Sequence, residues 1–309
     1  MNDSDFPAVA VIMSVKNGEK YVAEQVDSIL AQKDVHIDLF IRNNGSTDST
    51  KEILQNYNDK YPNVHAHHEK DIGWIEGFLT ELESVSGFEY YAFSDHDDVW
   101  MPQKLITAIK AIKQEESRRG KDTPIVWQCN CLVTDDKLNV TRKTISHRRK
   151  RTIESMMLRI NARGCVMVFN AKVRELVITH GHLSGGHDTV AMLHMYAANG
   201  SALFDPEALI YYRQRGDNLA ATPKTYAEMF RSELRNMRLL KGFGVSAANA
   251  VLQAYGDELD PAMKKNLMLV MQHKDSFLAR LKIILSPTFS TGILRATILG
   301  KIKALIGWL

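Results

Sequence analysis

Cysteine is scarce in this sequence, and long uninterrupted apolar runs are missing. The 309 residues include three cysteines, Cys129, Cys131 and Cys165. Three are too few for a disulfide framework, and the Cys129-x-Cys131 spacing does not match a zinc knuckle. All three lie in apolar stretches, so we expect buried free thiols in a reducing cytoplasm. Because no uncharged apolar stretch reaches about 18 residues, no membrane-spanning helix is expected.

Strong net charge and the common phosphate-binding glycine motifs are absent as well. The formal net charge is +3 at pH 7, which is too small to indicate nucleic acid as a partner. The N-terminus carries Asp3 and Asp5 where a signal peptide would have a basic region before an apolar one, so none is expected. There is no dinucleotide-binding glycine fingerprint and no Walker lysine motif. Composition otherwise indicates an ordinary globular protein.

The first third of the sequence alternates between strand-like and helix-like segments. The apolar run over residues 8–15 predicts a strand buried on both faces, and residues 21–30 follow with apolar side chains at helical spacing. The same pattern repeats three more times: strands are expected at 36–41, at 64–67 and before Ser94, and helices at 50–57 and 75–85. This alternation predicts an α/β fold, a Rossmann-like and mostly parallel sheet with helices on both faces.

The segment over residues 90–100 joins an apolar strand to three acids, Asp95, Asp97 and Asp98. Divalent cations such as Mn²⁺ and Mg²⁺ prefer carboxylate oxygens and often share them with substrate phosphates. Asp95 and Asp97 point to the same side if the chain is extended, and ligands bind at the carboxyl ends of strands in open α/β sheets. We therefore expect a cation and diphosphate site, the alternative being a polar loop in which Asp98 caps the next helix.

Polar turns follow the first two strands at the same edge of the sheet. Asn17 lies in the first turn, and Asn43, Asn44 and Ser46 lie in the second. Their amide and hydroxyl groups are suited to a nucleotide base or ribose. An ordinary β–α turn also accounts for these residue types, so the sequence leaves both interpretations open.

Three segments in this order, residues 11–21, 44–50 and 93–100, resemble the family 2 glycosyltransferases, most closely the bacterial rhamnosyltransferases of surface-polysaccharide synthesis. The resemblance implies a GT-A fold, with a catalytic domain at 1–222 and a helical C-terminal region at 223–309. It implies that Asp97 ligates a divalent cation that grips the donor diphosphate, and that Asp95 faces the ribose and the metal. Two aspartates are common where this chain has Asn43-Asn44, so the resemblance leaves open how the base is recognised and which base it is.

Later segments supply the rest of the site by the same resemblance. Asp188, in Gly-Gly-His-Asp, matches the family's catalytic base, which an inverting transfer needs to take the acceptor proton. Arg215 stands where the family often has a metal-ligating histidine; an arginine pairs with phosphate oxygens instead. The full set expected to contact the donor is Val15, Asn17, Asn43, Asn44, Ser46, Gly73, Asp95, His96, Gly164, His187, Arg213 and Arg215.

The C-terminal third is predicted to be helical and basic. Helices are expected at 226–240, at 247–255 and from Pro261 through Leu278. Residues 276–309 contain no acid, and their bases accompany apolar residues near helical spacing: Leu294, Ile298, Ile302, Leu305 and Leu309. Such a helix can lie on an anionic membrane, pack on the catalytic domain or form a dimer interface. The basic stretch at 141–150 is interpreted either as a solvated loop or as a contact for a phosphorylated acceptor or acidic lipid.

These observations predict an inverting glycosyltransferase that moves L-rhamnose from dTDP-rhamnose onto a lipid-linked glycan, at the inner face of the plasma membrane and with Mn²⁺ or Mg²⁺ as cofactor. A transferase for UDP-hexose or UDP-N-acetylhexosamine on the same fold is the second interpretation. The third is a non-catalytic carbohydrate-binding scaffold, which Asn43, Asn44 and Arg215 would favour.

Overall fold

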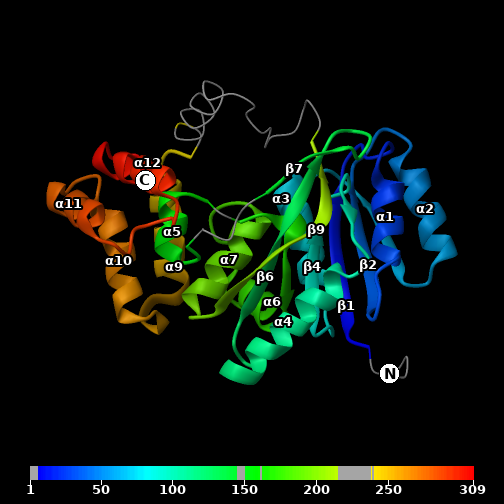
Figure 1. Cartoon of the computed structure of the whole chain (residues 1–309), viewed down its shortest axis with the longest axis horizontal. Helices are drawn as coiled ribbons and strands as arrows, with labels where there is room; N and C mark the ends of the chain where they lie inside the picture. The colour runs from blue at the N-terminus through cyan, green and yellow to red at the C-terminus, as the bar shows by residue number, and fades with distance from the viewer. Residues whose placement is uncertain (1–5, 145–149, 161, 215–237, 239) are drawn as a thin grey trace.

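The computed structural model describes residues 6–144, 150–160, 162–214, 238 and 240–309 (Figure 1). A sheet of nine strands has the order β3-β2-β1-β4-β8-β6-β9-β5, with β7 paired to β6. The strands are β1 Ala8–Val15, β2 His36–Asn44, β3 Val64–Glu69, β4 Tyr90–Ser94, β5 Val99–Trp100, β6 Ile125–Thr134, β7 Val140–Lys143, β8 Val168–Asn170 and β9 Ser201–Arg213.

The first four strands of the chain are parallel to one another. β1 pairs in parallel with β2 and β4, and β2 pairs in parallel with β3. The other half of the sheet is mixed, because β8 runs antiparallel to both β4 and β6 while β9 is parallel to β6. The predicted Rossmann-like α/β fold is confirmed, and the carboxyl ends of β1 to β4 lie at one edge of the sheet.

Alternation along β1 builds a core on each face of the sheet. Val9, Val11 and Met13 belong to a cluster with α1 (Val22–Leu30), α2 (Thr50–Lys60) and α4 (Lys104–Arg119). Ala10 and Ile12 belong to the opposite cluster, with α3 (Trp74–Ser84), α5 (Ile153–Leu158), α6 (Ala171–His180) and α7 (His187–Ala197). Because successive strand residues face opposite sides, a strand covered on both faces must be almost entirely apolar, as β1 is apart from Ser14 near its carboxyl end.

The C-terminal helices are α9 Phe243–Tyr255, α10 Pro261–Gln272, α11 Phe277–Leu285 and α12 Leu294–Leu305. The expected single helix from Pro261 through Leu278 is wrong. Ser276 begins a new helix there, since its side chain accepts the Ala279 N–H at 3.2 Å. The predicted helix at 226–240 and the boundary at 222 lie almost wholly outside the described residues.

The structure tests the expectations about the three cysteines and about a membrane-spanning helix. Cys129, Cys131 and Cys165 are buried and free, as predicted. Among the described residues, no helix combines the length and the apolarity needed to cross a bilayer.

Candidate active site

A cavity of about 680 Å³ opens where the carboxyl ends of β1, β2 and β4 meet. Many of the predicted site residues line it: Val15, Asn44, Gly73, Asp95, His96, Asp97, Gly164, His187 and Asp188. Asn17, Asn43, Ser46 and Arg213 are not in its lining, and Arg215 lies outside the described residues. The cavity therefore brings the acidic loop and the candidate base together.

The acidic loop after β4 delivers its carboxylates to this cavity. Burial raises the pKa of Asp95 to about 7, and the nearby charges of Asp97 and Asp188 add to the rise. Oxygen atoms of Asp95 and Asp98 and the Cys165 sulfur lie within 4.8 Å of one another. Asp98 is fully buried, and its Oδ2 has no hydrogen-bond partner among the described residues. Asp95 and Asp97 line the cavity, whereas Asp98 and Cys165 do not. Carboxylate oxygens are the ligands that Mn²⁺ and Mg²⁺ prefer, so Asp95 and Asp97 fit such an ion.

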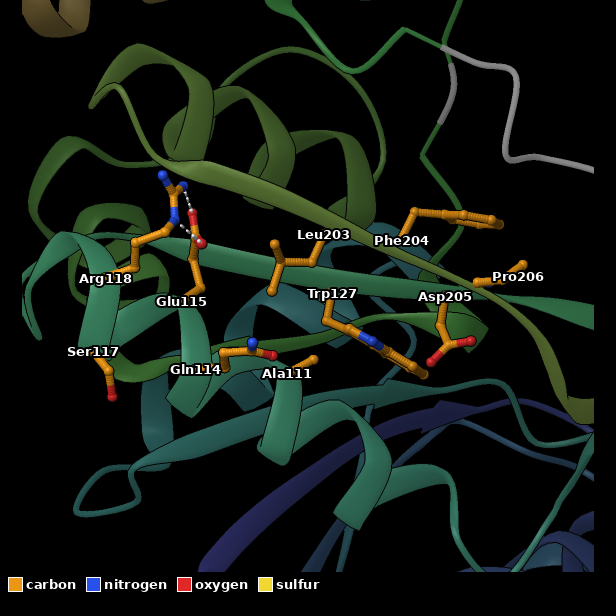
Figure 2. Close-up of a pocket in the computed structure, with 10 residues that line it drawn as sticks. All are labelled: Ala111, Gln114, Glu115, Ser117, Arg118, Trp127, Leu203, Phe204, Asp205 and Pro206. Carbon is orange, nitrogen blue, oxygen red and sulfur yellow. Dashed lines mark hydrogen bonds and ion pairs between the residues drawn. The ribbon is translucent and has the colours of Figure 1, made fainter.

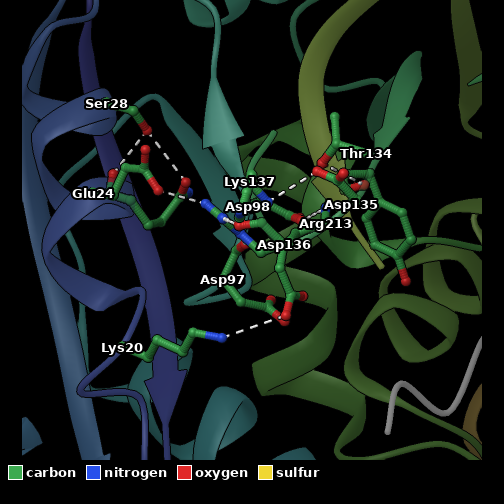
Figure 3. Close-up of polar contacts among 12 residues, drawn as sticks. Lys20, Glu24, Ser28, Asp97, Asp98, Thr134, Asp135, Asp136, Lys137 and Arg213 are labelled. Carbon is green, nitrogen blue, oxygen red and sulfur yellow. Dashed lines mark hydrogen bonds and ion pairs between the residues drawn. The ribbon is translucent and has the colours of Figure 1, made fainter. Parts of the chain in front are cut away.

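Arg213, the last residue of β9, ties the acidic loop to a neighbouring helix (Figure 3). Its backbone N–H donates to Asp98 Oδ1 at 3.1 Å, and its Nε donates to the Asp97 carbonyl at 2.9 Å. The guanidinium also pairs with Glu24 of α1. Arg213 is 3% exposed, so the structure gives it a positioning function. Its expected contact with the diphosphate stays a prediction.

The loops after β1 and β2 are bonded to each other. The Asn17 backbone N–H donates to Ser46 Oγ at 2.9 Å, and Asn17 Oδ1 accepts the Thr47 N–H at 2.9 Å. Asn43 Oδ1 accepts the Ser46 N–H at 3.2 Å. Asn44 alone among these predicted residues reaches the cavity. Contacts of Asn17, Asn43 and Ser46 with a base or ribose therefore stay predictions.

Asp188 reaches the cavity from a separate element, the N-terminus of α7. The chain enters this helix through Gly185, whose φ of 111° suits glycine and strains other residues. Asp188 Oδ1 accepts the Thr189 N–H at 2.6 Å, and the positive end of the helix dipole favours a negative charge here. A carboxylate from α7 therefore lines the same cavity as Asp95 and Asp97 of the β4 loop.

His187 lies beside Asp188 as a buried, neutral imidazole. It is 3% exposed, and its ring stacks on Phe78 with 3.9 Å between centroids. Burial lowers its pKa to about 4, so the ring is uncharged at pH 7. Neither ring nitrogen has a hydrogen-bond partner among the described residues. A Cβ at Gly164 would overlap Nε2, so the glycine leaves this nitrogen its space. Buried polar atoms without partners are costly, so this imidazole is an unusual part of the cavity lining.

Sequence reasoning missed five residues that line the cavity: Ser14, Lys16, Asp71, Trp74 and Phe78. Ala162, Arg163 and Tyr212 also line it, and they belong to the segments around Gly164 and Arg213 that the resemblance placed at the donor. Lys16 and Asp71 form an ion pair at 2.5 Å, and Arg163 lies over the Tyr212 ring, 5.0 Å from its centroid. Asp71 lies in the turn directly after β3, and Trp74 is the first residue of α3. Because the carboxyl ends of parallel strands meet at one edge of the sheet, the reasoning that pointed to Asn44 after β2 could also have found Asp71 after β3.

A second cavity, of about 650 Å³, lies between α4 and the strands β6 and β9 (Figure 2). Its charged residues already have partners: Arg118 donates to Glu115 at 2.7 Å, and Asp205 Oδ1 accepts the Glu207 N–H at 2.8 Å. None of its lining residues belongs to the predicted site. The first cavity is therefore the candidate active site.

Comparison with known proteins agrees with this geometry. The dTDP-rhamnosyl transferase RfbG of Shigella flexneri is 35% identical over 105 residues, which cover 32% of this chain and 36% of RfbG. The chain thus spans little more than a third of that curated relative. S. aureus TarS 1-349, solved in complex with UDP, superposes with a TM-score of 0.58 at 15% identity, covering 96% of this chain and 81% of TarS. The mannosyltransferase PcManGT of Pyrobaculum calidifontis, solved with GDP-Man and Mn²⁺, gives a TM-score of 0.54 at 16% identity, covering 98% and 88%.

These structural likenesses concern the fold, which is GT-A. The sequence match is more specific: the model of the family described as "Glycosyl transferase family 2" matches residues 10–169. That span runs from β1 through β8 and includes the acidic loop and Gly164. Since it covers more than half of the chain, this protein belongs to glycosyl transferase family 2.

Proposed function

We propose that the chain is an inverting glycosyltransferase that moves L-rhamnose from dTDP-rhamnose onto a lipid-linked glycan during the synthesis of a bacterial surface polysaccharide. One observation carries the proposal: carboxylates from two separate elements meet at one cavity. Asp95 and Asp97 come from the loop after β4, and Asp188 comes from α7. A single displacement at a sugar diphosphate needs this division between charge stabilisation and proton removal.

In the proposed reaction, an acceptor hydroxyl oxygen attacks the anomeric carbon from the face opposite the diphosphate. The new carbon–oxygen bond forms as the bond to the diphosphate oxygen breaks, and that electron pair leaves with the nucleoside diphosphate. The configuration at the carbon inverts. The acceptor proton passes to a carboxylate oxygen of Asp188, whose position at the start of α7 keeps it directed into the cavity.

Asp95 and Asp97 are the residues that would hold a divalent cation. When bound, Mn²⁺ or Mg²⁺ would neutralise charge that grows on the departing diphosphate. Arg213 keeps the Asp97 backbone in place, and Arg163 adds a fixed positive charge to the lining of the cavity. These side chains orient the diphosphate away from Asp188, so that attack and departure occur on opposite sides.

The lining of the cavity favours a deoxy sugar. L-rhamnose carries a methyl group where common hexoses carry a hydroxymethyl group, and apolar side chains of Val15, Phe78 and Ala162 are available for it. The neutral nitrogens of His187 are suited to the ring hydroxyls. The similarity to RfbG supports the same donor.

Trp74 is assigned to the acceptor side. Its side chain is 52% exposed although it lines the cavity. A methyl group built on Gly186 would lie 3.1 Å from Asp188 Oδ1 and 3.2 Å from Trp74 Cη2, so the indole and the base flank the same point. Aromatic faces pack against the apolar face of a sugar ring, which would place an acceptor hydroxyl next to Asp188.

The test is a donor panel that includes dTDP-rhamnose, UDP-glucose, UDP-N-acetylglucosamine and GDP-mannose. Binding is measured by calorimetry, and slow hydrolysis by release of the nucleoside diphosphate, each with Mn²⁺, Mg²⁺ or EDTA. We expect selective use of dTDP-rhamnose that EDTA abolishes. Selective use of a UDP-sugar would keep the mechanism and replace the donor. Failure to bind any donor would overturn the enzyme proposal in favour of the scaffold interpretation.

A further inference from the structure

Apart from the buried Lys303, helix α12 packs against the protein with its small side chains, and it turns most of its large apolar side chains outward. Ala296, Gly300 and Ala304 are buried, and a Cβ at Gly300 would lie 2.8 Å from Leu158 Cβ, so α12 lies close against α5. Leu294 and Ile298 are 78% and 49% exposed. An amphipathic helix of a globular protein normally buries its large apolar side chains. In α12 the packing is reversed.

Helix α11 repeats this arrangement. It buries Ala279 and Ile283, while Phe277 and Leu285 are 70% and 72% exposed. At about 100° per residue, its exposed apolar side chains fall within roughly 100° of arc, so they form one stripe and not a scatter of single residues. Isolated exposed apolar residues are normal, but a contiguous set marks an interaction site.

The two helices form one unit. Arg280 of α11 donates to the Leu305 carbonyl at 3.2 Å, and Lys301 of α12 donates to the Ile284 carbonyl at 2.7 Å. These contacts pair the two helices antiparallel. We call their exposed large apolar side chains the C-terminal apolar face: Phe277, Leu278, Leu281, Leu285, Leu294, Ile298, Ile302, Leu305 and Ile306.

The two helices of the C-terminal apolar face carry basic residues and no acidic ones. No Asp or Glu follows Asp275 in the sequence. Lys282 and Arg295 are exposed on the same two helices. Lys150 joins them, because its backbone N–H donates to the Thr291 carbonyl at 2.8 Å, just before α12. The surface thus combines apolar side chains with one sign of charge.

We propose that the C-terminal apolar face docks on the surface of an anionic lipid bilayer. Apolar side chains would enter the boundary between headgroups and acyl chains, and the basic ones would contact anionic headgroups. A second copy fits less well, since a two-fold interface would bring two basic, acid-free surfaces together. Figure 1 places α11 and α12 at the opposite end of the molecule from α1 and α2, so docking leaves the loops after β1 and β2 accessible.

The test is flotation of the full chain with vesicles of phosphatidylcholine, with or without phosphatidylglycerol, in the absence of donor and acceptor. The outcome is therefore independent of the proposed function. We expect binding to the anionic vesicles that weakens at least about tenfold in L285Q/I298Q. K282Q/R295Q should weaken it about fivefold per charge removed, an effect that salt diminishes. The matched control is I178Q, because Ile178 is equally apolar and 42% exposed but lies on α6.

Circular dichroism of each variant checks that the fold is retained. Light scattering without vesicles gives the oligomeric state. The proposal is overturned if the wild type does not float with anionic vesicles, or if L285Q/I298Q floats as well as I178Q. A wild-type dimer that L285Q/I298Q dissociates would overturn it as well, by identifying a second copy as the occupant.

Discussion

Helices α1 and α12 both carry large apolar residues at helical spacing, but α1 buries them and α12 exposes most of them. α1 buries Val22, Val26 and Ile29 against the sheet, whereas α12 buries small residues and exposes Leu294 and its neighbours. Helical spacing of apolar residues therefore predicts a helix without predicting which face is turned inward. The difference separates two tasks: apolar side chains stabilise the fold around the active site, and at the C-terminal end they remain available for a partner.

The largest expected effect tests whether sugar transfer depends on the active-site region and not on the C-terminal helices. Asp188→Asn removes the proposed base with little change in shape, so transfer to an acceptor should fall about 10²- to 10⁴-fold. Donor affinity, measured by calorimetry, and vesicle binding should be unchanged. L285Q/I298Q is the converse control and should retain transfer to a water-soluble acceptor. Undiminished transfer by the Asp188 variant would exclude Asp188 as the base.

The next effect compares how much one isoleucine in α1 and one in α12 contribute to the stability of the fold. Ile29→Ala should lower the free energy of unfolding by about 2–5 kcal/mol, because a buried side chain is lost and a cavity is left. Ile298→Ala should change it by no more than about 0.5 kcal/mol, because that side chain is largely exposed. Urea unfolding followed by circular dichroism measures both. Equal losses would mean that α12 contributes to the core like α1.

The sequence was sufficient to predict the parallel part of the fold. β1 covers the expected residues, and α1 begins at Val22, one residue later than expected. The break between α10 and α11 was missed because helical periodicity continues across it, while Ser276 bonds locally to the Ala279 N–H. Local side-chain bonds of this kind compete with helix propensity and are invisible in the apolar pattern.

Some site residues could be predicted from the sequence and others could not. Asp95 and Asp97 reach the cavity because strand β4 ends there. Their place could be predicted, since ligands bind at the carboxyl ends of parallel strands. Asp188 required the family resemblance, since nothing in its spacing relates it to β4. Asn17 and Ser46 could not be placed, because their side chains bond to the neighbouring loop and not to the cavity.

A smaller effect is expected at His187, whose unused nitrogens only a structure reveals. His187→Phe keeps an aromatic ring stacked on Phe78 and removes the unsatisfied polar atoms. Stability should stay the same or rise, because buried polar atoms without partners are costly. Donor KM should rise about tenfold through loss of a sugar hydrogen bond. An unchanged donor KM would show that the imidazole does not contact the sugar.

The smallest effect is expected at Trp74, and it distinguishes the exposed tryptophan of the active site from the exposed apolar side chains of α11 and α12. Trp74→Ala should raise the acceptor KM about fivefold, the scale of one lost aromatic contact, while donor binding is unchanged. Trp74→Phe should restore most of the affinity, since a flat ring remains. Vesicle binding should be the same in both variants. If Trp74→Ala weakened flotation and left the acceptor KM unchanged, this side chain would belong to the membrane-facing surface, and the two regions would not be functionally separate.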